Sequence, residues 1–262
     1  MVARIVGGIV FLIAGLLIGG GVAAADEALD RAFEVLATYD WGSERAPLQA
    51  LDRAVVGAHG DQQAARHLEN RLVEALEAAT TRAAKDYLCR QLSLVGSAAC
   101  VPAVAGLLAD EELSHMARYA LQRIPAPAAA AALREAVSQL EGNLQIGVIH
   151  SLGVRRDAES AGALIELLDA ADQQVAAAAA AALGQIANPA AREALAEFQQ
   201  RAPAALQLAA ADAYLACAER LLADGQRTQA VAIYRTLATA EQPAPIRLAA
   251  TRGMLAATRQ SD

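Results

Sequence analysis

Apolar side chains recur at three- and four-residue spacing over much of this chain, and short polar stretches interrupt them at regular distances. The clearest segment runs from Leu144 to Gly184, where the pattern predicts three helices separated by two polar turns. The first helix closes at Leu152-Gly153 and the third at Leu183-Gly184, 31 residues later. The two outer helices are therefore versions of one pattern.

This helix end recurs along the chain with a nearly constant period. The equivalent positions are Leu92, Leu121, Leu152, Leu183, Tyr214 and Met254, separated by 29, 31, 31, 31 and 40 residues. A fixed period of about 30 residues with two helices per unit is the signature of a stacked helical solenoid. We therefore predict an all-α fold.

The helices that end the units read AKDYLCRQLSLVG, LSHMARYALQRIP, LQIGVIHSLG, QVAAAAAAALGQI and IRLAATRGML. The intervening helices read VPAVAGLLAD, AGALIELLDAAD and REALAEFQQ. They resemble the second and first helices of HEAT repeats, of the short bacterial subtype called PBS-lyase HEAT-like, over roughly residues 80–258. This resemblance implies a right-handed α-solenoid in which the second helices line the concave side.

Three runs resemble a more particular HEAT region, that of secreted bacterial proteins. They are CRQLSLVG, HMARYALQRIP and GVRRDAES. In some of those proteins a β-sandwich similar to a 3-keto-disaccharide hydrolase follows the repeats, whereas this sequence ends at Asp262 without one.

The last interval is longer than the others, and its extra residues read AERLLADGQRTQAVAIYRTLATAEQ. This segment resembles a tetratricopeptide-type helix pair. Its first helix ends at Gly225, and its second carries Ala230, Ile233, Tyr234 and Leu237 on one face. Because both kinds of pair stack compatibly, we expect one hybrid solenoid rather than two domains.

Residues 1–25 have the pattern of a targeting segment. Arg4 supplies a positive charge, Ile5–Val22 is apolar and uncharged, and Ala23-Ala24-Ala25 offers a small-residue cleavage site before Asp26. We expect a cleaved signal peptide and a periplasmic or secreted protein without further membrane attachment. An uncleaved membrane anchor is the alternative, because the apolar run approaches the ~20 residues that span a bilayer.

Residues 26–79 are expected to form N-terminal capping helices and a degenerate repeat, and residues 80–262 the HEAT-like repeats. An amphipathic helix over Asp26–Ala37 is broken at Tyr39–Gly42, which holds the only Trp. We interpret this aromatic cluster as a hydrophobic cover for the first repeat, since terminal units need capping, with a binding patch as the alternative. A helical pair follows over Pro47–Val56 and Gln62–Ala79.

The composition agrees with thin helical layers. Hydrophobic residues make up 55% of the chain but aromatic residues only 3%, and alanine supplies much of the difference. A net charge of −7 without a basic run indicates no nucleic-acid partner, because phosphate contacts need clustered Lys and Arg. Cys89, Cys100 and Cys217 all sit in apolar helical patterns and are expected to be buried thiols; a Cys89–Cys100 bridge is the alternative.

No catalytic motif is found: HExxH, GxSxG, a P-loop, GxGxxG and zinc-spaced Cys or His pairs are all missing from the sequence. We therefore expect no enzyme activity, no cofactor and no metal. Arg155, Arg156 and Asp157 resemble the usual inter-helix turn of such repeats, so capping and salt bridging are their expected roles.

One polar group shares the face that the second helices are expected to present. It lies two or six residues before the helix ends and comprises Asp86, Arg90, His115, Tyr119 and His150. These residues form the candidate binding patch on the concave face. Alternatively, they solvate one helix face and link neighbouring repeats through ordinary hydrogen bonds. The second half of the same face is rich in alanine.

These observations favour an exported, non-catalytic scaffold that binds a protein partner on its concave face. Two enzymatic alternatives rest on resemblance alone: an accessory module of a carbohydrate-processing, 3-keto-disaccharide hydrolase-like system, and a bilin-lyase-like enzyme. A purely structural spacer is a further alternative.

The last predicted helix, Pro245–Thr258, is patterned like an internal one although little chain follows it. Its apolar residues include Leu248 and Leu255. A terminal repeat normally turns a polar face to water. We therefore expect apolar surface at this end, covered by a second copy in a homodimer or by a separate partner.

The first testable prediction concerns export. The mature protein should begin near Asp26, so intact-mass measurement of exported material should show the loss of about 25 residues. Recovery of the full mass in the membrane fraction would instead identify residues 1–25 as an anchor.

Overall fold

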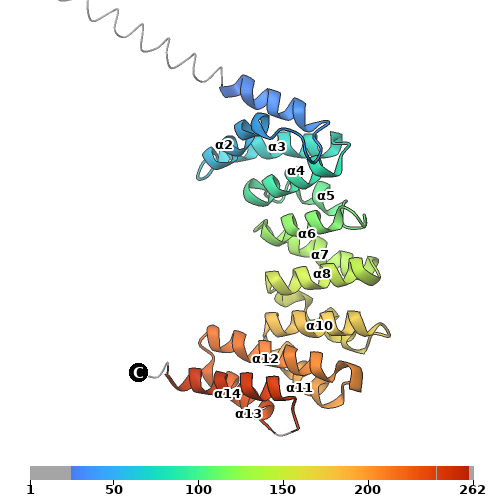
Figure 1. The fold of residues 1–262 in the computed structure, drawn as a ribbon, viewed down its shortest axis with the longest axis vertical. Coiled ribbons are helices and arrows are strands. Elements are labelled where there is room, and N and C mark those ends of the chain that lie inside the picture. Colours follow the sequence, from blue (N-terminus) through green and yellow to red (C-terminus); the bar gives the residue numbers. More distant parts are fainter. Residues whose placement is uncertain (1–24, 240, 260–262) are drawn as a thin grey trace, which may run out of the picture. The chain divides into compact units, whose positions relative to one another are not determined.

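The computed structural model describes residues 25–239 and 241–259, and every regular element within these ranges is helical, as predicted (Figure 1). The predicted signal segment lies outside the described residues, except for its last residue. None of the described helices combines the length and hydrophobicity needed to cross a bilayer. The chain divides into two compact units, Met1–Val104 and Ala105–Asp262, and each is described by itself.

In the first unit, a helix over residues 25–36 precedes the short 3₁₀ helix η1 (Ala46–Leu48) and the helices α2 (Gln49–Gly57), α3 (Gln62–Ala78) and α4 (Arg82–Val95). Asp61 caps α3 by accepting from the backbone N–H groups of Gln63 and Ala64, and Thr81 caps α4. The core is built from the apolar stripes of these helices, among them Leu51, Leu68, Leu72, Leu88 and Leu92.

Two carboxylates fix the interior of this unit. Asp52 on α2 accepts from the Tyr87 hydroxyl at 2.8 Å and from the Gln91 amide at 3.0 Å, tying α2 to α4. Burial, together with the bond to Asp52, raises the pKa of Tyr87 well above its usual range. Glu69 is 2% exposed and accepts from the backbone N–H groups of Ser97 and Cys100, at 2.6 and 3.1 Å. A buried carboxylate thus holds the turn after α4.

The aromatic cluster does not form the hydrophobic cover that we predicted. Trp41 is 61% exposed, and its ring lies beneath the guanidinium of Arg82, 5.5 Å from the ring centroid. Only Tyr39 of the cluster turns inward, with its ring 6.4 Å from that of Tyr87. The prediction that Trp41 covers the first repeat is therefore wrong, because the turn that carries Trp41 directs its indole toward solvent.

The second unit begins within the short helix α5 (Val101–Ala105) and continues as two layers. The second helices α6 (Ser114–Arg123), α8 (Gly142–Arg155), α10 (Gln173–Ile186), α12 (Gln207–Ala223) and α14 (Ala244–Arg259) pack on one another in chain order. The first helices α7 (Pro127–Gln139), α9 (Ala161–Glu166), α11 (Pro189–Arg201) and α13 (Arg227–Leu237) pack against them. The 3₁₀ helices η2 (Ala158–Ser160), η3 (Leu167–Asp169) and η4 (Ala204–Leu206) lie in the connections.

The second helices run past the ends that the sequence suggested. Leu152 and Leu183 are buried as expected, but α8 and α10 continue for three residues beyond them. Each helix then stops at a residue in the left-handed region, Arg156 with φ of 55° and Ala187 with φ of 51°. The predicted end at Tyr214 is also wrong, because α12 continues to Ala223.

The glycines that we took as helix ends are instead places of close helix contact. A β-carbon on Gly153 would lie 2.9 Å from the Cα of Ala182, and one on Gly184 would lie 2.5 Å from the carbonyl oxygen of Ala213. Real β-carbons essentially never come so near. The glycines therefore let α8 approach α10, and α10 approach α12, more closely than any other residue would allow.

The turn after α8 has the capping and salt-bridging roles that its sequence predicted. Arg155 donates to three carbonyl oxygens at the end of α6, those of Leu121 at 2.6 Å, Gln122 at 3.2 Å and Ile124 at 2.7 Å. These are carbonyls that the helix itself leaves unpaired. Asp157 pairs with Arg134 on α7 at 2.7 Å.

The C-terminal helix pair matches its predicted pattern. Gly225 has φ of 78° after α12, and the apolar residues of α13 that we placed on one face are buried. On α14, Ile246 is buried, whereas Leu248 and Leu255 are 53% and 56% exposed. Apolar surface therefore lies open on α14, as the sequence indicated.

The close contact of α10 with α12 gives a prediction with an internal control. Gly184→Ala should lower the free energy of unfolding by about 1–3 kcal/mol, because the added methyl meets backbone that cannot move independently. Gly162→Ala on α9 adds the same methyl into open space and should not destabilise, since alanine is the better helix former. Urea denaturation of both variants measures the difference; equal midpoints would contradict the contact.

Candidate functional site

The five residues of the predicted patch fall into the two units. Asp86 and Arg90 lie on α4 in the first unit, whereas His115 and Tyr119 on α6 and His150 on α8 lie in the second. Each group is therefore considered within its own unit.

Asp86 and Arg90 form an ion pair along one helix. The Arg90 Nε atom donates to the Asp86 Oδ2 atom at 2.9 Å, and the two side chains are 55% and 20% exposed. Such i,i+4 pairs contribute only about 0.2–0.5 kcal/mol to a helix. The pair agrees with the solvated-face interpretation of these two residues.

His115, Tyr119 and His150 reach the surface of the second-helix layer in their unit. His115 and His150 are exposed and Tyr119 is half-buried. The guanidinium of Arg123 lies over the Tyr119 ring, 3.7 Å from its centroid, and Arg123 also donates to the Tyr119 carbonyl at 3.3 Å. Two histidines and a stacked arginine–tyrosine pair thus belong to one surface.

The sequence analysis missed Arg118, which occupies the seam between α6 and α8. Its Nη1 atom donates to the Gly147 carbonyl at 3.1 Å, while its Nε atom is buried without a hydrogen-bond partner. A β-carbon on Gly147 would lie 2.5 Å from the Arg118 Cζ atom, so only glycine accommodates the guanidinium there. Burial lowers the pKa of Arg118.

Arg118 also acts on its neighbour His150. Partial burial, followed by the positive charge of Arg118, lowers the pKa of His150 below its ordinary value. Among the described side chains, no carboxylate forms an ion pair with Arg118. Arg118 is therefore a partly buried cation without an ion-pair partner among the described residues.

A hydrogen-bond ladder accompanies this seam. Gln122 on α6 donates to the Ser151 hydroxyl on α8 at 2.8 Å, and Ser151 in turn donates to the Gly147 carbonyl at 3.0 Å. Ser151 is fully buried. Gln122 and Ser151 thus link α6 to α8 through neutral hydrogen bonds.

Further along the same layer, α8, α10 and α12 form a groove of about 470 Å³. It is lined by Val154, Arg156, Gln185, Ala216, Glu219, Arg220 and Ala223. Val154 is 57% exposed, and Asp224 at the margin accepts from both Arg156 and Arg220. The alanine-rich half of the face therefore has one charged feature that the sequence did not reveal.

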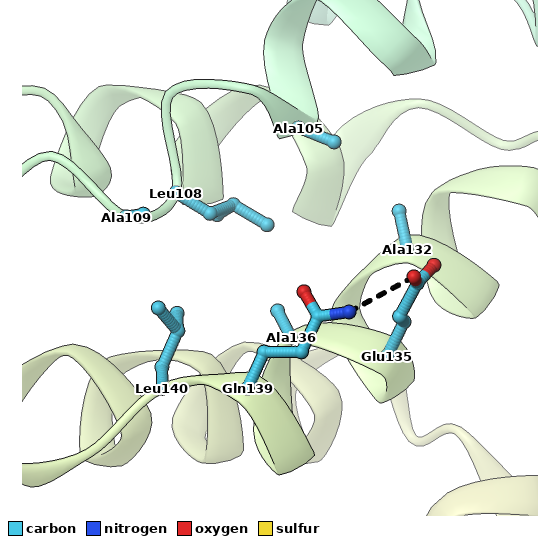
Figure 2. A pocket seen from close by; sticks show the side chains of 8 residues that line it. All are labelled: Ala105, Leu108, Ala109, Ala132, Glu135, Ala136, Gln139 and Leu140. Carbon is cyan, nitrogen blue, oxygen red and sulfur yellow. Dashed lines mark hydrogen bonds between the residues drawn. The ribbon is translucent and has the colours of Figure 1, made fainter.

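A smaller hollow of about 220 Å³ lies on the first-helix side, between residues 105–109 and α7 (Figure 2). Leu108 and Leu140 line it, and the Gln139 amide donates to Glu135 at 3.0 Å across its margin. It offers no nucleophile beside a base, and it is smaller than most ligand pockets, which start near 300 Å³. We interpret it as a packing gap.

Reactive groups are scarce in the described part of the chain. Its three thiols are free and buried, and burial raises the pKa of Cys89 and of Cys100 to about 12. Such thiols are poor nucleophiles at neutral pH because the thiolate is the reactive form. Over the same residues, no cluster of three or more His, Cys, Asp or Glu has the arrangement to hold a metal ion.

Comparison with known proteins gives similarity in structure only. No protein-family model matches the sequence, and no curated protein matches it. Two engineered proteins are similar in structure. The first has a TM-score of 0.43 and 19% sequence identity, and the match covers 87% of this chain and 67% of that chain. The second has a TM-score of 0.42 and 17% identity, and the match covers 80% of this chain and 96% of that chain. Human deoxyhypusine hydroxylase in complex with glycerol is similar at a TM-score of 0.33 and 17% sequence identity. The match covers 92% of this chain and 99% of that chain.

The coupling between Arg118 and His150 can be tested by titration. Arg118→Met should raise the pKa of His150 toward its ordinary value of 6.5, because the like charge is removed. Arg123→Met removes a charge from the same helix but not the one acting on His150, and should leave that pKa unchanged. NMR titration of the imidazole resonances measures both; no rise in the Arg118 variant would contradict the coupling.

The lowered pKa of His150 also determines how this residue makes the free energy of unfolding depend on pH. The unfolded chain takes up a proton on His150 more readily than the folded chain does. His150 therefore favours unfolding as the pH falls through about 6.5, and the Arg118→Met variant should lose part of this dependence.

Proposed function

We propose that this chain is an exported, non-catalytic scaffold, a right-handed α-solenoid of HEAT-like helix pairs, whose second-helix face binds a protein partner. The observation that carries the proposal is the repetition of one contact along the second unit. Residues 29 positions apart meet again and again: Arg118 with Gly147, Gln122 with Ser151, Gly153 with Ala182, and Gly184 with Ala213. A constant offset between packed helices is the property of repeat proteins.

The second-helix face supports the binding role. One residue from each successive second helix falls on the same row, namely His115, Ile146, Ala177, Leu208 and Leu248. None of the five is buried, and Leu208 and Leu248 are each 53% exposed. Stacked repeats offer such extended faces to partners, because each unit adds one strip of side chains.

Export and the absence of catalysis belong to the same proposal. The signal-like pattern of residues 1–25 supports export, and all of this segment except its last residue lies outside the described residues. Neither the carbohydrate-processing nor the bilin-lyase-like alternative gains support from a particular observation. The thiols of the described residues are buried and their pKa values are raised, and the repeated helix contacts support a scaffold.

Site-specific photocrosslinking tests which face meets a partner. We would replace Leu208 on α12 with a photoreactive residue in cells that produce the chain, and would replace the exposed Gln200 on α11 as the opposite-layer control. An adduct should form from position 208 and not from position 200. It should be strongly reduced by Ala181→Lys, which places a long side chain on the same face.

Adducts of equal yield from the two layers would contradict a dedicated face. The absence of adducts at position 208, in a chain whose circular dichroism and mass are normal, would favour the structural spacer.

A further inference from the structure

Within helices α6 to α11, the acidic residues all lie in the first-helix layer. Helices α6, α8 and α10 contain three arginines, Arg118, Arg123 and Arg155, and not one Asp or Glu. The first helices α7, α9 and α11 carry four glutamates and three arginines: Glu135, Glu166, Glu193 and Glu197, with Arg134, Arg192 and Arg201. In a chain of net charge −7, the start of the second-helix face is thus positive.

The Arg118 guanidinium is positioned by the packing of α6 against α8, and no carboxylate of the described residues neutralises its charge. Its seat exists only because residue 147 is glycine, and its Nε atom is buried without an acceptor. Burying part of an unpaired cation costs free energy, which a nearby carboxylate would recover. The chain has 29 acidic residues, yet no described carboxylate pairs with Arg118.

Arg123 extends this positive surface toward solvent. Its guanidinium lies over the Tyr119 ring, with the Cζ atom 3.7 Å from the ring centroid, and the residue is exposed. Stacking on a ring orients the planar group and leaves its N–H edges available for the bidentate contacts that carboxylates prefer. A guanidinium ordered before binding loses less entropy when it binds.

We infer that the surface of α6 and α8, formed by His115, Arg118, Tyr119, Arg123 and His150, binds an acidic segment of the partner protein. Carboxylates of the segment pair with Arg123 at the exposed edge and with the positive seam of Arg118 behind it. This inference rests on the proposed scaffold function and adds the chemistry and the location of the contact. It also gives the three patch residues of the second unit a common role.

The test uses defined peptides and the mature full chain. A fluorescein-labelled peptide of alternating Glu and Ala should bind saturably by fluorescence anisotropy, whereas its Lys–Ala and Gln–Ala counterparts should not. Added salt should weaken binding, because exposed charge pairs are screened. The peptide should also shift the NMR signals of His115 and His150, which places it on this surface.

Arg123→Gln is the decisive variant, since Arg123 is exposed at the end of α6 and its loss leaves the core intact. It should weaken binding of the Glu–Ala peptide about three- to tenfold. Arg235→Gln on α13 is the matched control: an exposed arginine with the same change of net charge on the other layer. It should leave the affinity unchanged.

Three results would overturn the inference: no saturable binding of the Glu–Ala peptide, an equal loss of affinity in the two variants, or equal affinity for an oligothymidylate. The last would show a general polyanion surface instead of a carboxylate site. An adduct at position 208 together with any of these would leave the scaffold standing and refute only the acidic partner.

Discussion

Gly184 lies so near α12 that a β-carbon there would overlap the carbonyl oxygen of Ala213, and a β-carbon on Gly153 would clash with the backbone of α10. Much else in the second unit depends on this closeness. Small residues at the seam bring the backbones together, and packing of the larger side chains follows on either side of it. Because aromatic residues make up only 3% of the chain, stability comes from many contacts between small side chains on closely packed helices rather than from one large aromatic core.

Close stacking also decides what the polar residues can do. Where α6 meets α8, Gly147 leaves room for a guanidinium and not for a side chain of its own. Ser151 and Gln122 complete the seam with neutral hydrogen bonds. The position of the Arg118 guanidinium therefore depends on the same close approach that joins the helices.

The sequence predicted the helical class and the buried leucines because apolar periodicity reports burial directly. It misplaced the ends of α8 and α10, since glycine after leucine is typical both of a helix end and of a close helix contact. The true ends at Arg156 and Ala187 carry no glycine, so no local signal marks them. Trp41 misled us for a related reason: composition suggests a cover, but the direction of one turn decides the exposure.

The candidate site was predictable only in part. Its column positions placed His115, Tyr119 and His150 on one layer, because residues on one helix face share their surroundings. Arg118 lies three residues before Leu121, outside the columns that we examined, and its meaning depends on Gly147, 29 residues away. The partner of a side chain across a seam can be found only once the offset between helices is known.

The paired left-handed residues have a consequence for how such a chain can change in length. Arg156 and Ala187 stop successive second helices with nearly the same backbone geometry, 31 residues apart. The close contact of the segment between them with the next helix, Gly184 against Ala213, repeats the contact that the preceding helix makes with it, Gly153 against Ala182. We therefore expect this segment to behave as a unit of insertion. An in-frame duplication of it would place the same pair of contacting helices side by side once more, so the chain would lengthen without a new kind of interface.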